Sequence, residues 1–286
     1  PVLTNDVTKH PSRLLSEAMQ HYLQLKGIGK AKTFHQAAIR NTKVVTDILG
    51  DRVLTEYRSV DAGRVRDELL ARNLSVLSIR RIFTTVKAII NLSITEHGLD
   101  IRNPFSQIYL PDGESKKRVS IPVDTIREIQ QACYQYDDDM RWLIALISDT
   151  GMRLAEAAGL SIEDLKVNET IPHVVIKEYP WRILKTKDSN RVIPLVGEAL
   201  WSAKRIVEDQ NSQFAFPKYN KTSTTNSNSA SSSLNKWIKG LGYGEYTMHC
   251  FRHSLRDRLR AIECPTDIAD QIGGWSVQSI GQVYGS

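Results

Sequence analysis

The sequence has few cysteines, and their number and spacing argue against two common kinds of stabilising site. The three cysteines (Cys133, Cys250 and Cys264) are an odd number and form no C-x-x-C pair. Neither a disulfide framework nor a cysteine-based zinc site is indicated, so a reducing compartment is expected. No apolar run approaches the roughly 20 residues that a membrane-spanning helix needs, and no signal peptide is recognisable. The chain starts at Pro1 rather than methionine, so we expect it to be part of a longer chain.

Positive charge is unevenly distributed along the chain. Residues 1–110 hold 16 lysines and arginines against 10 acidic residues, whereas residues 111–286 hold 22 of each, so the net charge of +6 comes entirely from the first segment. A basic segment joined to a neutral one favours a polyanionic partner bound by the first, although a merely basic protein would show the same totals. At 286 residues and 41% hydrophobic, the chain is long enough for two domains with cores of their own.

The periodicity of apolar residues predicts that the first segment is all-helical. Four stretches have helical spacing: 12–26, 33–49, 60–72 and a longer one that begins at a Ser75 cap. The segment closes at Asn103-Pro104-Phe105, because proline ends the helix before it. We predict phosphate contacts from three cations on the polar face of the longest helix, although a solvated basic face is the plain alternative. These cations are Arg80, Arg81 and Lys87.

A polar stretch containing proline and glycine, residues 111–120, is predicted to link a first domain (1–110) to a second (121–286). Its consecutive cations Lys116, Lys117 and Arg118 are candidates for crossing a nucleic-acid backbone.

The second domain is predicted to be mostly helical with a small sheet. Residues 140–149 are apolar nearly all round, which indicates a buried helix that stops at Thr150-Gly151. Three short β-branched runs, at 174–176, 182–184 and 191–195, predict a small antiparallel sheet. Residues 220–233 have almost no apolar content and are predicted to be a mobile loop, with helices resuming at Leu234.

Four motifs in the second domain carry groups suited to phosphate chemistry. Each alone has an ordinary interpretation, namely a surface ion pair, a solvated hairpin, a helix turn and a packing tyrosine. Thr150-Gly-Met-Arg-Leu-Ala-Glu156 places an arginine in the first helical turn after a glycine, with a carboxylate three residues on. A basic tip, 185–191, precedes Val-Ile-Pro-Leu, and His249-Cys-Phe-Arg-His253 begins a helix. Gly273-Gly274-Trp275 is followed nine residues later by Tyr284.

In this order the four motifs resemble the tyrosine recombinase family, the phage integrases and their relatives. That family has T-G-x-R-x-x-E, a hairpin lysine before a V-I-P-L-like strand, H-x-x-R-H, and L-G-H with a tyrosine nine residues later. The resemblance covers nearly the whole chain. It implies a mainly α fold with a small antiparallel β-sheet, made of an all-helical, SAM-like core-binding domain and an α+β catalytic domain.

The resemblance assigns roles to the motif residues. Arg153 and Arg252 would clamp the scissile phosphate, because fixed forks of N–H donors meet the charge that builds on its oxygens. Tyr284 would be the nucleophile and His249 its proton acceptor, since a phenol with a pKa near 10 needs help at neutral pH. Glu156 would orient Arg153 rather than touch DNA.

The remaining positions depart from the family pattern or leave a choice. Trp275 stands where the family has histidine, and an indole N–H donates to a phosphate but transfers no proton. Lys185 is our candidate for the general acid that protonates the leaving 5′ hydroxyl. Lys187 is the second candidate, because alternate residues of a strand share a face. His253 is expected to support the helix turn rather than the chemistry.

The implied activity is site-specific DNA recombination through a 3′-phosphotyrosyl intermediate, integrating or excising a phage or other mobile element. It implies double-stranded DNA as partner, a homotetramer on synapsed DNA, and accessory DNA-bending or directionality factors. Neither a cofactor nor a metal is expected, nor a membrane, and the expected location is the cytoplasm at the bacterial nucleoid. The alternatives are a type IB topoisomerase, which reseals the same strand, and a non-catalytic DNA-binding accessory protein. The Asn103-Pro104-Phe105 junction and the T-G-x-R-x-x-E form favour the recombinase.

Overall fold

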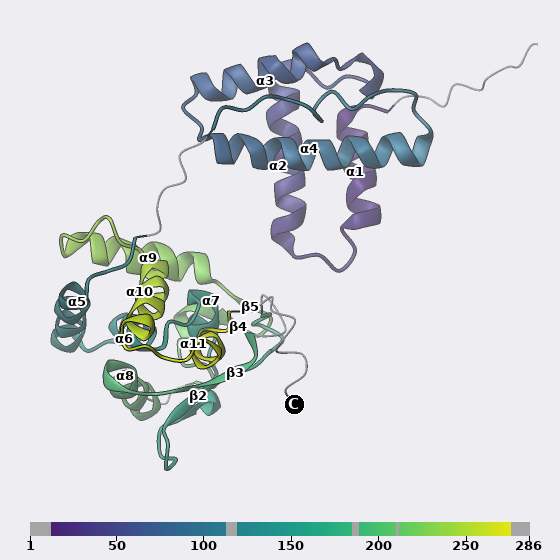
Figure 1. Ribbon diagram of the computed structural model, residues 1–286. Coiled ribbons are helices and arrows are strands. Elements are labelled where there is room, and N and C mark those ends of the chain that lie inside the picture. Colours follow the sequence, from purple (N-terminus) through teal and green to yellow (C-terminus); the bar gives the residue numbers. More distant parts are fainter. Residues whose placement is uncertain (1–12, 113–118, 185–188, 210–211, 276–286) are drawn as a thin grey trace, which may run out of the picture. The chain divides into compact units, whose positions relative to one another are not determined.

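A computed structural model describes residues 13–112, 119–184, 189–209 and 212–275 (Figure 1). The chain divides into two compact units, Pro1–Lys116 and Lys117–Ser286. The division falls inside the 111–120 segment to which the sequence assigns the linker. Each unit has a hydrophobic cluster of its own, as expected for a chain of this length and composition.

In its described part the first unit has four α-helices, at the four predicted stretches, and no strand beyond an isolated bridge between Leu14 and Val53. Helices α1 and α2 lie side by side and pack against α4, while α3 contacts α2 and α4 (Figure 1). Ser75 caps α4 as predicted, since its hydroxyl accepts a hydrogen bond from the Ser78 amide, and Ser12 lies outside the described residues. The elements are α1 (Leu15–Lys26), α2 (Lys32–Leu49), η1 (Leu54–Glu56), α3 (Ser59–Ala71) and α4 (Val76–His97).

The end of the first unit is fixed to α4 by a buried amide. The Asn103 side chain donates to the Lys87 carbonyl at 3.0 Å and to Asn91 Oδ1 at 2.6 Å. Its own oxygen accepts from the Phe105 amide at 2.9 Å, which places the Phe105 ring against Phe83 of α4. The Asn-Pro-Phe junction is therefore a packed corner rather than the start of a loose linker.

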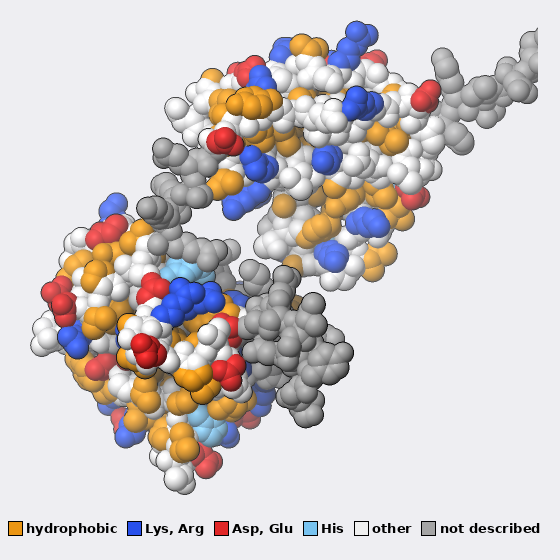
Figure 2. All heavy atoms as spheres, viewed as in Figure 1, with side chains coloured by type: hydrophobic (Ala, Val, Ile, Leu, Met, Phe, Trp, Pro, Cys, Tyr) orange, Lys and Arg blue, Asp and Glu red, His pale blue; other side chains and the backbone are white. Residues whose placement is uncertain are grey.

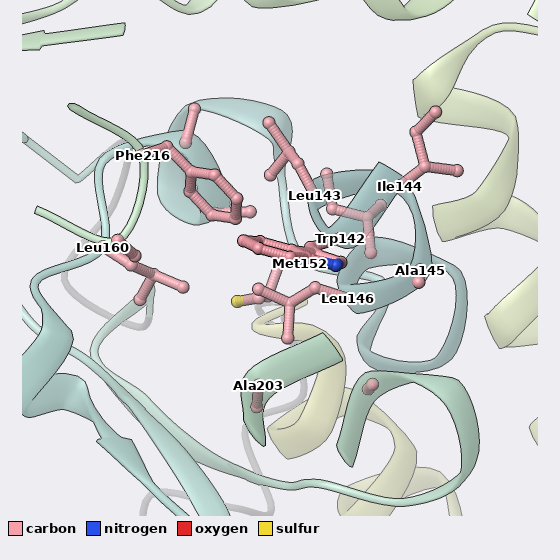
Figure 3. Close-up of a cluster of buried hydrophobic side chains, with 14 of the residues drawn as sticks. Trp142, Leu143, Ile144, Ala145, Leu146, Met152, Leu160, Ala203 and Phe216 are labelled. Atoms are coloured by element: carbon pink, nitrogen blue, oxygen red, sulfur yellow. The ribbon is translucent and has the colours of Figure 1, made fainter. Parts of the chain in front are cut away.

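The second unit is built around α6 (Asp139–Thr150), which α5 (Val123–Tyr136), α8 (Gly197–Glu208) and α10 (Met248–Ala261) contact. Five consecutive residues of α6, from Leu143 to Ile147, are fully buried, so the predicted all-round burial is confirmed. Figure 3 shows the cluster that α6 forms with Met152, Leu160 and Phe216. The short helix α7 (Leu154–Ala158) contacts α6, and α11 (Thr266–Gly273) contacts α10 and the sheet.

The small antiparallel sheet is present, but one of its predicted strands is wrong. Its strand order is β1 (Leu165–Lys166), β2 (His173–Ile176) and β3 (Arg191–Pro194), with Val174 opposite Ile193. Residues 182–184 form only an isolated bridge between Tyr179 and Arg182. At this point the Arg182 guanidinium is buried against the carboxylate of Asp164.

The predicted mobile loop at 220–233 is also wrong. The segment forms a hairpin, β4 (Asn220–Lys221) with β5 (Thr224–Thr225), and then the first half of α9 (Ser227–Gly240). Asn226 caps α9 by accepting from the Ser229 amide at 3.0 Å, while Ala230 and Leu234 are fully buried. A helix needs only a narrow apolar stripe, so the serine-rich composition of this segment did not exclude one.

Candidate active site

A left-handed glycine begins the candidate site. Helix α6 ends at Gly151, whose φ is +59°, and a Cβ there would lie 2.5 Å from Leu255 Cδ2. Both facts require glycine, because other residues are strained at positive φ and this one has no room. The turn places Arg153 at the N-cap of α7. The sequence had placed it inside the first helical turn, one position too far.

Arg153 is bonded to Glu156 through both its guanidinium and its backbone amide. Arg153 Nη1 donates to Glu156 Oε1 at 2.6 Å, and the Arg153 amide donates to Glu156 Oε2 at 3.0 Å. The Glu156 carboxylate is only 3% exposed. The Glu156 carboxylate therefore restrains both the guanidinium and the backbone amide of Arg153.

A second arginine on the same carboxylate, Arg191 of β3, was missed by sequence reasoning. Its Nη2 donates to Glu156 Oε2 at 2.9 Å, its Nε to the Ile272 carbonyl at 2.9 Å and its Nη1 to the Ser189 carbonyl at 2.8 Å. The side chain is 3% exposed. One signal was available, because strand alternation puts Arg191 on the same inward face as Ile193.

The two arginines bring the pKa of Glu156 below its ordinary value. Burial alone would raise this pKa, but the hydrogen bond and charge of Arg191, together with the hydrogen bonds from the Arg153 side chain and amide, outweigh it. Glu156 therefore stays ionised at neutral pH and keeps both guanidinium groups in place.

Arg252 of α10 lies beside this pair and is 3% exposed. Its Nη1 donates to the Gly151 carbonyl at 2.9 Å, while its buried Nη2 has no hydrogen-bond partner within the described parts of the chain. Burial, and then the positive charge of Arg153, lower the pKa of Arg252 to about 10. An N–H donor that is buried beside like charges and left unpaired is suited to receive an anion.

Trp275 lies over the same arginine. The Arg252 Cζ atom is 4.7 Å from the centre of the Trp275 ring system, and the Arg256 Cζ atom is 5.0 Å from it. Arg153 Nη2 donates to the Gly274 carbonyl at 3.2 Å, so the chain just before Trp275 is tied to the first motif. The structure thus brings together Arg153, from just after the end of α6, with Arg252 and Trp275, from the last part of the described chain.

The two glycines before Trp275 are required by close contacts. A Cβ on Gly273 would lie 2.1 Å from the Trp275 ring, and one on Gly274 would lie 2.9 Å from Arg191 Nη1. Gly274 also has a φ of +58°. The two glycines of the Gly-Gly-Trp motif therefore leave room at the end of α11 for the Trp275 indole and the Arg191 guanidinium.

His249 and His253 lie one turn apart on α10, on the helix that carries Arg252. Their rings meet edge to face with centroids 4.7 Å apart; His249 is exposed and His253 half-buried. This contact is consistent with the supporting position expected of His253, whose role stays a prediction.

Several predicted site residues belong to the first unit or lie outside the described residues. Arg80, Arg81 and Lys87 are exposed on α4 of the first unit, and Figure 2 shows lysine and arginine side chains on the visible face of that unit. Within the ranges that the structure describes, no cluster of three or more His, Cys, Asp or Glu side chains could hold a metal ion. In the same ranges no helix is sufficiently long and apolar to cross a membrane. The predicted site residues that lie outside the described residues are Lys116, Lys117, Arg118, Lys185, Lys187 and Tyr284.

Fold and site together define a class: a mainly helical protein with a cluster of buried arginines whose chemistry suits a phosphate-like anion. The model of the phage integrase family matches residues 120–286, more than half of the chain. The chain belongs to this family, the tyrosine recombinases, and is thereby a site-specific DNA recombinase; neither the topoisomerase nor the accessory-protein alternative is favoured.

Solved structures of similar fold include integrases. A Tn1549 transposon integrase in complex with circular intermediate DNA has a TM-score of 0.74 at 16% identity, covering 96% of each chain. A lambda integrase dimer bound to a core site has a TM-score of 0.70 at 15% identity, covering 96% of this chain and 77% of the other. A lambda integrase tetramer bound to a Holliday junction also has a TM-score of 0.70 at 15% identity, with 94% and 79% covered. At these identities the likeness confirms the mainly helical fold with its small antiparallel sheet. No curated protein sequence matches the chain.

Proposed function

We propose that the chain cleaves and rejoins DNA strands through a covalent link between Tyr284 and a 3′ phosphate. The observation that carries this proposal is the buried guanidinium of Arg252 with its unpaired Nη2, beside an Arg153 held by Glu156. Two guanidinium groups held by the protein match the non-bridging oxygens of a phosphodiester, whose negative charge grows during attack.

The reaction balances without an outside energy source. The Tyr284 oxygen attacks phosphorus, His249 accepts the phenolic proton, and the bond from phosphorus to the 5′ oxygen breaks. A proton from Lys185, with Lys187 as second candidate, goes to that 5′ oxygen. A 5′ hydroxyl of the partner duplex then reverses the step. Trp275 adds an indole N–H to the phosphate and packs beside Arg252.

The first unit is proposed to grip duplex DNA as a core-binding domain, 1–110, with the 111–120 linker crossing the backbone. The exposed cations of α4 supply sequence-independent phosphate contacts. Exchange between two duplexes implies a homotetramer on synapsed DNA, and a lambda integrase tetramer on a Holliday junction is the parallel among the similar structures. A phage or other mobile element as substrate, accessory bending or directionality factors, and a location at the nucleoid belong to the same proposal.

Trapping the covalent intermediate tests the chemistry. A nicked suicide substrate carrying the element's ends is incubated with the protein, and denaturing gels detect the adduct. The parent is expected to form it and Tyr284→Phe is expected to form none. If Tyr284→Phe forms the adduct equally well, the nucleophile is another residue and the proposal fails.

The role of Arg153 is tested by separating binding from cleavage. Arg153→Ala is expected to abolish cleavage while salt-sensitive DNA binding remains, because most binding free energy comes from other phosphate contacts. A loss of binding by orders of magnitude would show that Arg153 holds the fold rather than the transition state.

Strand exchange itself is tested on two marked duplexes. A recombinase joins ends from different duplexes, whereas a type IB topoisomerase relaxes supercoils and reseals the same strand. Recombinant products that depend on Tyr284 are the expected result.

A further inference from the structure

The chain is fixed on both sides of the predicted lysine segment, residues 185–188. Leu184, directly before it, is 8% exposed, and Ser189, directly after it, is fully buried. The Ser189 hydroxyl accepts a hydrogen bond from Arg153 Nη1 at 3.0 Å, and its carbonyl accepts one from Arg191 Nη1 at 2.8 Å. The exit from this segment is therefore bonded to the arginines of the site.

The entry to the segment is held by Arg182, a buried arginine that the proposed chemistry does not use. Its side chain is 2% exposed and forms an ion pair with Asp164 at 3.2 Å. It also donates to the Glu156 carbonyl at 3.1 Å and to the Lys177 carbonyl at 2.6 Å. Arg182 thus ties the chain three residues before Lys185 to α7, the helix whose Glu156 orients Arg153.

The surroundings of Arg182 are shaped to receive it. A Cβ on Gly159 would lie 2.9 Å from Arg182 Cδ, so the end of α7 must be glycine. The Trp181 indole donates to the Gly159 carbonyl at 3.0 Å, and the Tyr179 phenol donates to Asp164 Oδ1 at 2.8 Å. Burying a charge is costly unless every donor is paired, and a well-packed apolar side chain would fill such a place at lower cost. A purely packing role therefore accounts poorly for an arginine here.

We infer that Arg182 is a positioning residue for protonation of the leaving group, with Ser189 as its counterpart on the other side. Arg182 fixes where the chain enters the segment that carries the proton donor, and Ser189 fixes where it leaves, both relative to Arg153. Neither residue touches DNA or transfers a proton. The inference rests on the proposed function, in which a lysine of this segment protonates the 5′ oxygen as its bond to phosphorus breaks.

A sulfur-substituted substrate isolates this step. When sulfur replaces the bridging 5′ oxygen, the leaving group departs as a thiolate, because thiols are far more acidic than alcohols. Cleavage then needs no proton donor, while the arginine clamp and the nucleophile are needed as before. A defect confined to proton donation is therefore rescued by sulfur, and a defect in folding or clamping is not.

Arg182→Lys is the variant of choice. It keeps a positive charge beside Asp164 but lacks the guanidinium that donates to Asp164 and to the Glu156 and Lys177 carbonyls. We expect its cleavage of the all-oxygen suicide substrate to fall about tenfold to a hundredfold. On the sulfur substrate its rate is expected to stay within about twofold of the parent rate. Arg141→Lys is the matched control, a mostly buried arginine paired with Asp138 at 2.9 Å, and should match the parent on both substrates.

Ser189→Ala tests the other side with a smaller change. A slower reaction on oxygen is expected, and only partial recovery on sulfur, because the lost hydroxyl also accepts a hydrogen bond from Arg153 of the clamp. Ser202→Ala is its control, a fully buried serine of α8 whose hydroxyl donates to the Ala199 carbonyl. An equal loss on both substrates for Arg182→Lys and Ser189→Ala would overturn the inference, because it would place their effect on the clamp or the fold.

Lysine variants distinguish failure of this inference from failure of the proposed function. If Lys185→Ala or Lys187→Ala is rescued by sulfur but the Arg182 and Ser189 variants are not, only the positioning inference fails. If neither lysine variant is rescued, the proton donor is not in this segment, and the general-acid assignment fails along with the inference.

Discussion

Glu156→Gln is the change that most directly tests how the arginine site is held. The substitution keeps the size of the side chain and removes its charge. Glu156 accepts hydrogen bonds from Arg153 Nη1, the Arg153 amide and Arg191 Nη2. A glutamine offers one oxygen to these donors and points its own NH2 group at the others.

The expected loss follows from that count. At least one hydrogen bond to a charged group is lost inside the protein, and such bonds contribute about 1.5–3 kcal/mol each. Arg191, 3% exposed, is left with a weaker partner and no water to replace it. We therefore expect the free energy of unfolding of the second unit to fall by about 2–3 kcal/mol at pH 7.

Urea unfolding followed by tryptophan fluorescence measures this loss in the right unit. All five tryptophans (Trp142, Trp181, Trp201, Trp237 and Trp275) lie in the second unit, so their signal reports on it alone. Glu208→Gln is the control, because Glu208 pairs with Arg205 at 3.0 Å on the surface. Exposed pairs contribute about 0–1 kcal/mol, so the control should unfold close to the parent.

The difference between parent and Glu156→Gln should also depend on pH. The pKa of Glu156 is lowered in the folded protein. Its stabilisation is therefore complete above the unfolded pKa, about 4.3, and is lost as pH falls through the lower folded pKa. A gap that is wide at pH 7 and narrows in acid is expected. Equal unfolding midpoints of parent and Glu156→Gln at pH 7 would refute the view that this carboxylate holds the arginines.

Three further predictions concern the backbone, the indole and the first unit. Gly151→Ala combines a positive φ with a clash against Leu255, so it should lower the free energy of unfolding by about 2–4 kcal/mol. Gly98→Ala, at a similar φ in open space, should lower it by only about 1–2 kcal/mol. Urea unfolding of the unit that carries each substitution measures both losses. Trp275→Phe keeps a ring over Arg252 but loses the N–H, so suicide cleavage should fall by no more than about a hundredfold, less than for Arg252→Ala. Alanine at exposed cations of α4 should weaken DNA binding uniformly across sequences and lower the salt slope by about one for each phosphate that is no longer neutralised, as titrations would show. These cations are Arg80, Arg81 and Lys87.

The helices were predictable where apolar spacing alone decides burial. The stripe of α4 and the all-round burial of α6 follow directly from the order of their residues. Helix α9 was not predicted, because its cap (Asn226) and its buried residues (Ala230 and Leu234) are surrounded by serines. The low apolar content of the segment was judged without the spacing of these few residues. Residues 182–184 were assigned to a strand because the β-branched pattern gives no sign of the buried ion pair between Arg182 and Asp164.

The site was predictable as a set of residues but not as a network. Motif order identified Arg153, Glu156, Arg252 and Trp275, which the fold does bring together. Arg191 was missed because its partners, the Ile272 carbonyl and Glu156, come from distant segments and carry no sequence signature. Motifs record side chains that meet the substrate, whereas the contacts that aim them are largely backbone carbonyls.

The unpaired Nη2 of Arg252 has a consequence for the protein before it meets DNA. The like charges around this group repel one another, so any tetrahedral anion that binds there relieves the repulsion and completes the local hydrogen bonding. An anion bound only by the folded state stabilises that state by mass action. We therefore expect phosphate or sulfate in a buffer to be both a stabiliser and a competitor of this enzyme. Conditions that preserve the purified protein best are those in which its active site is already filled.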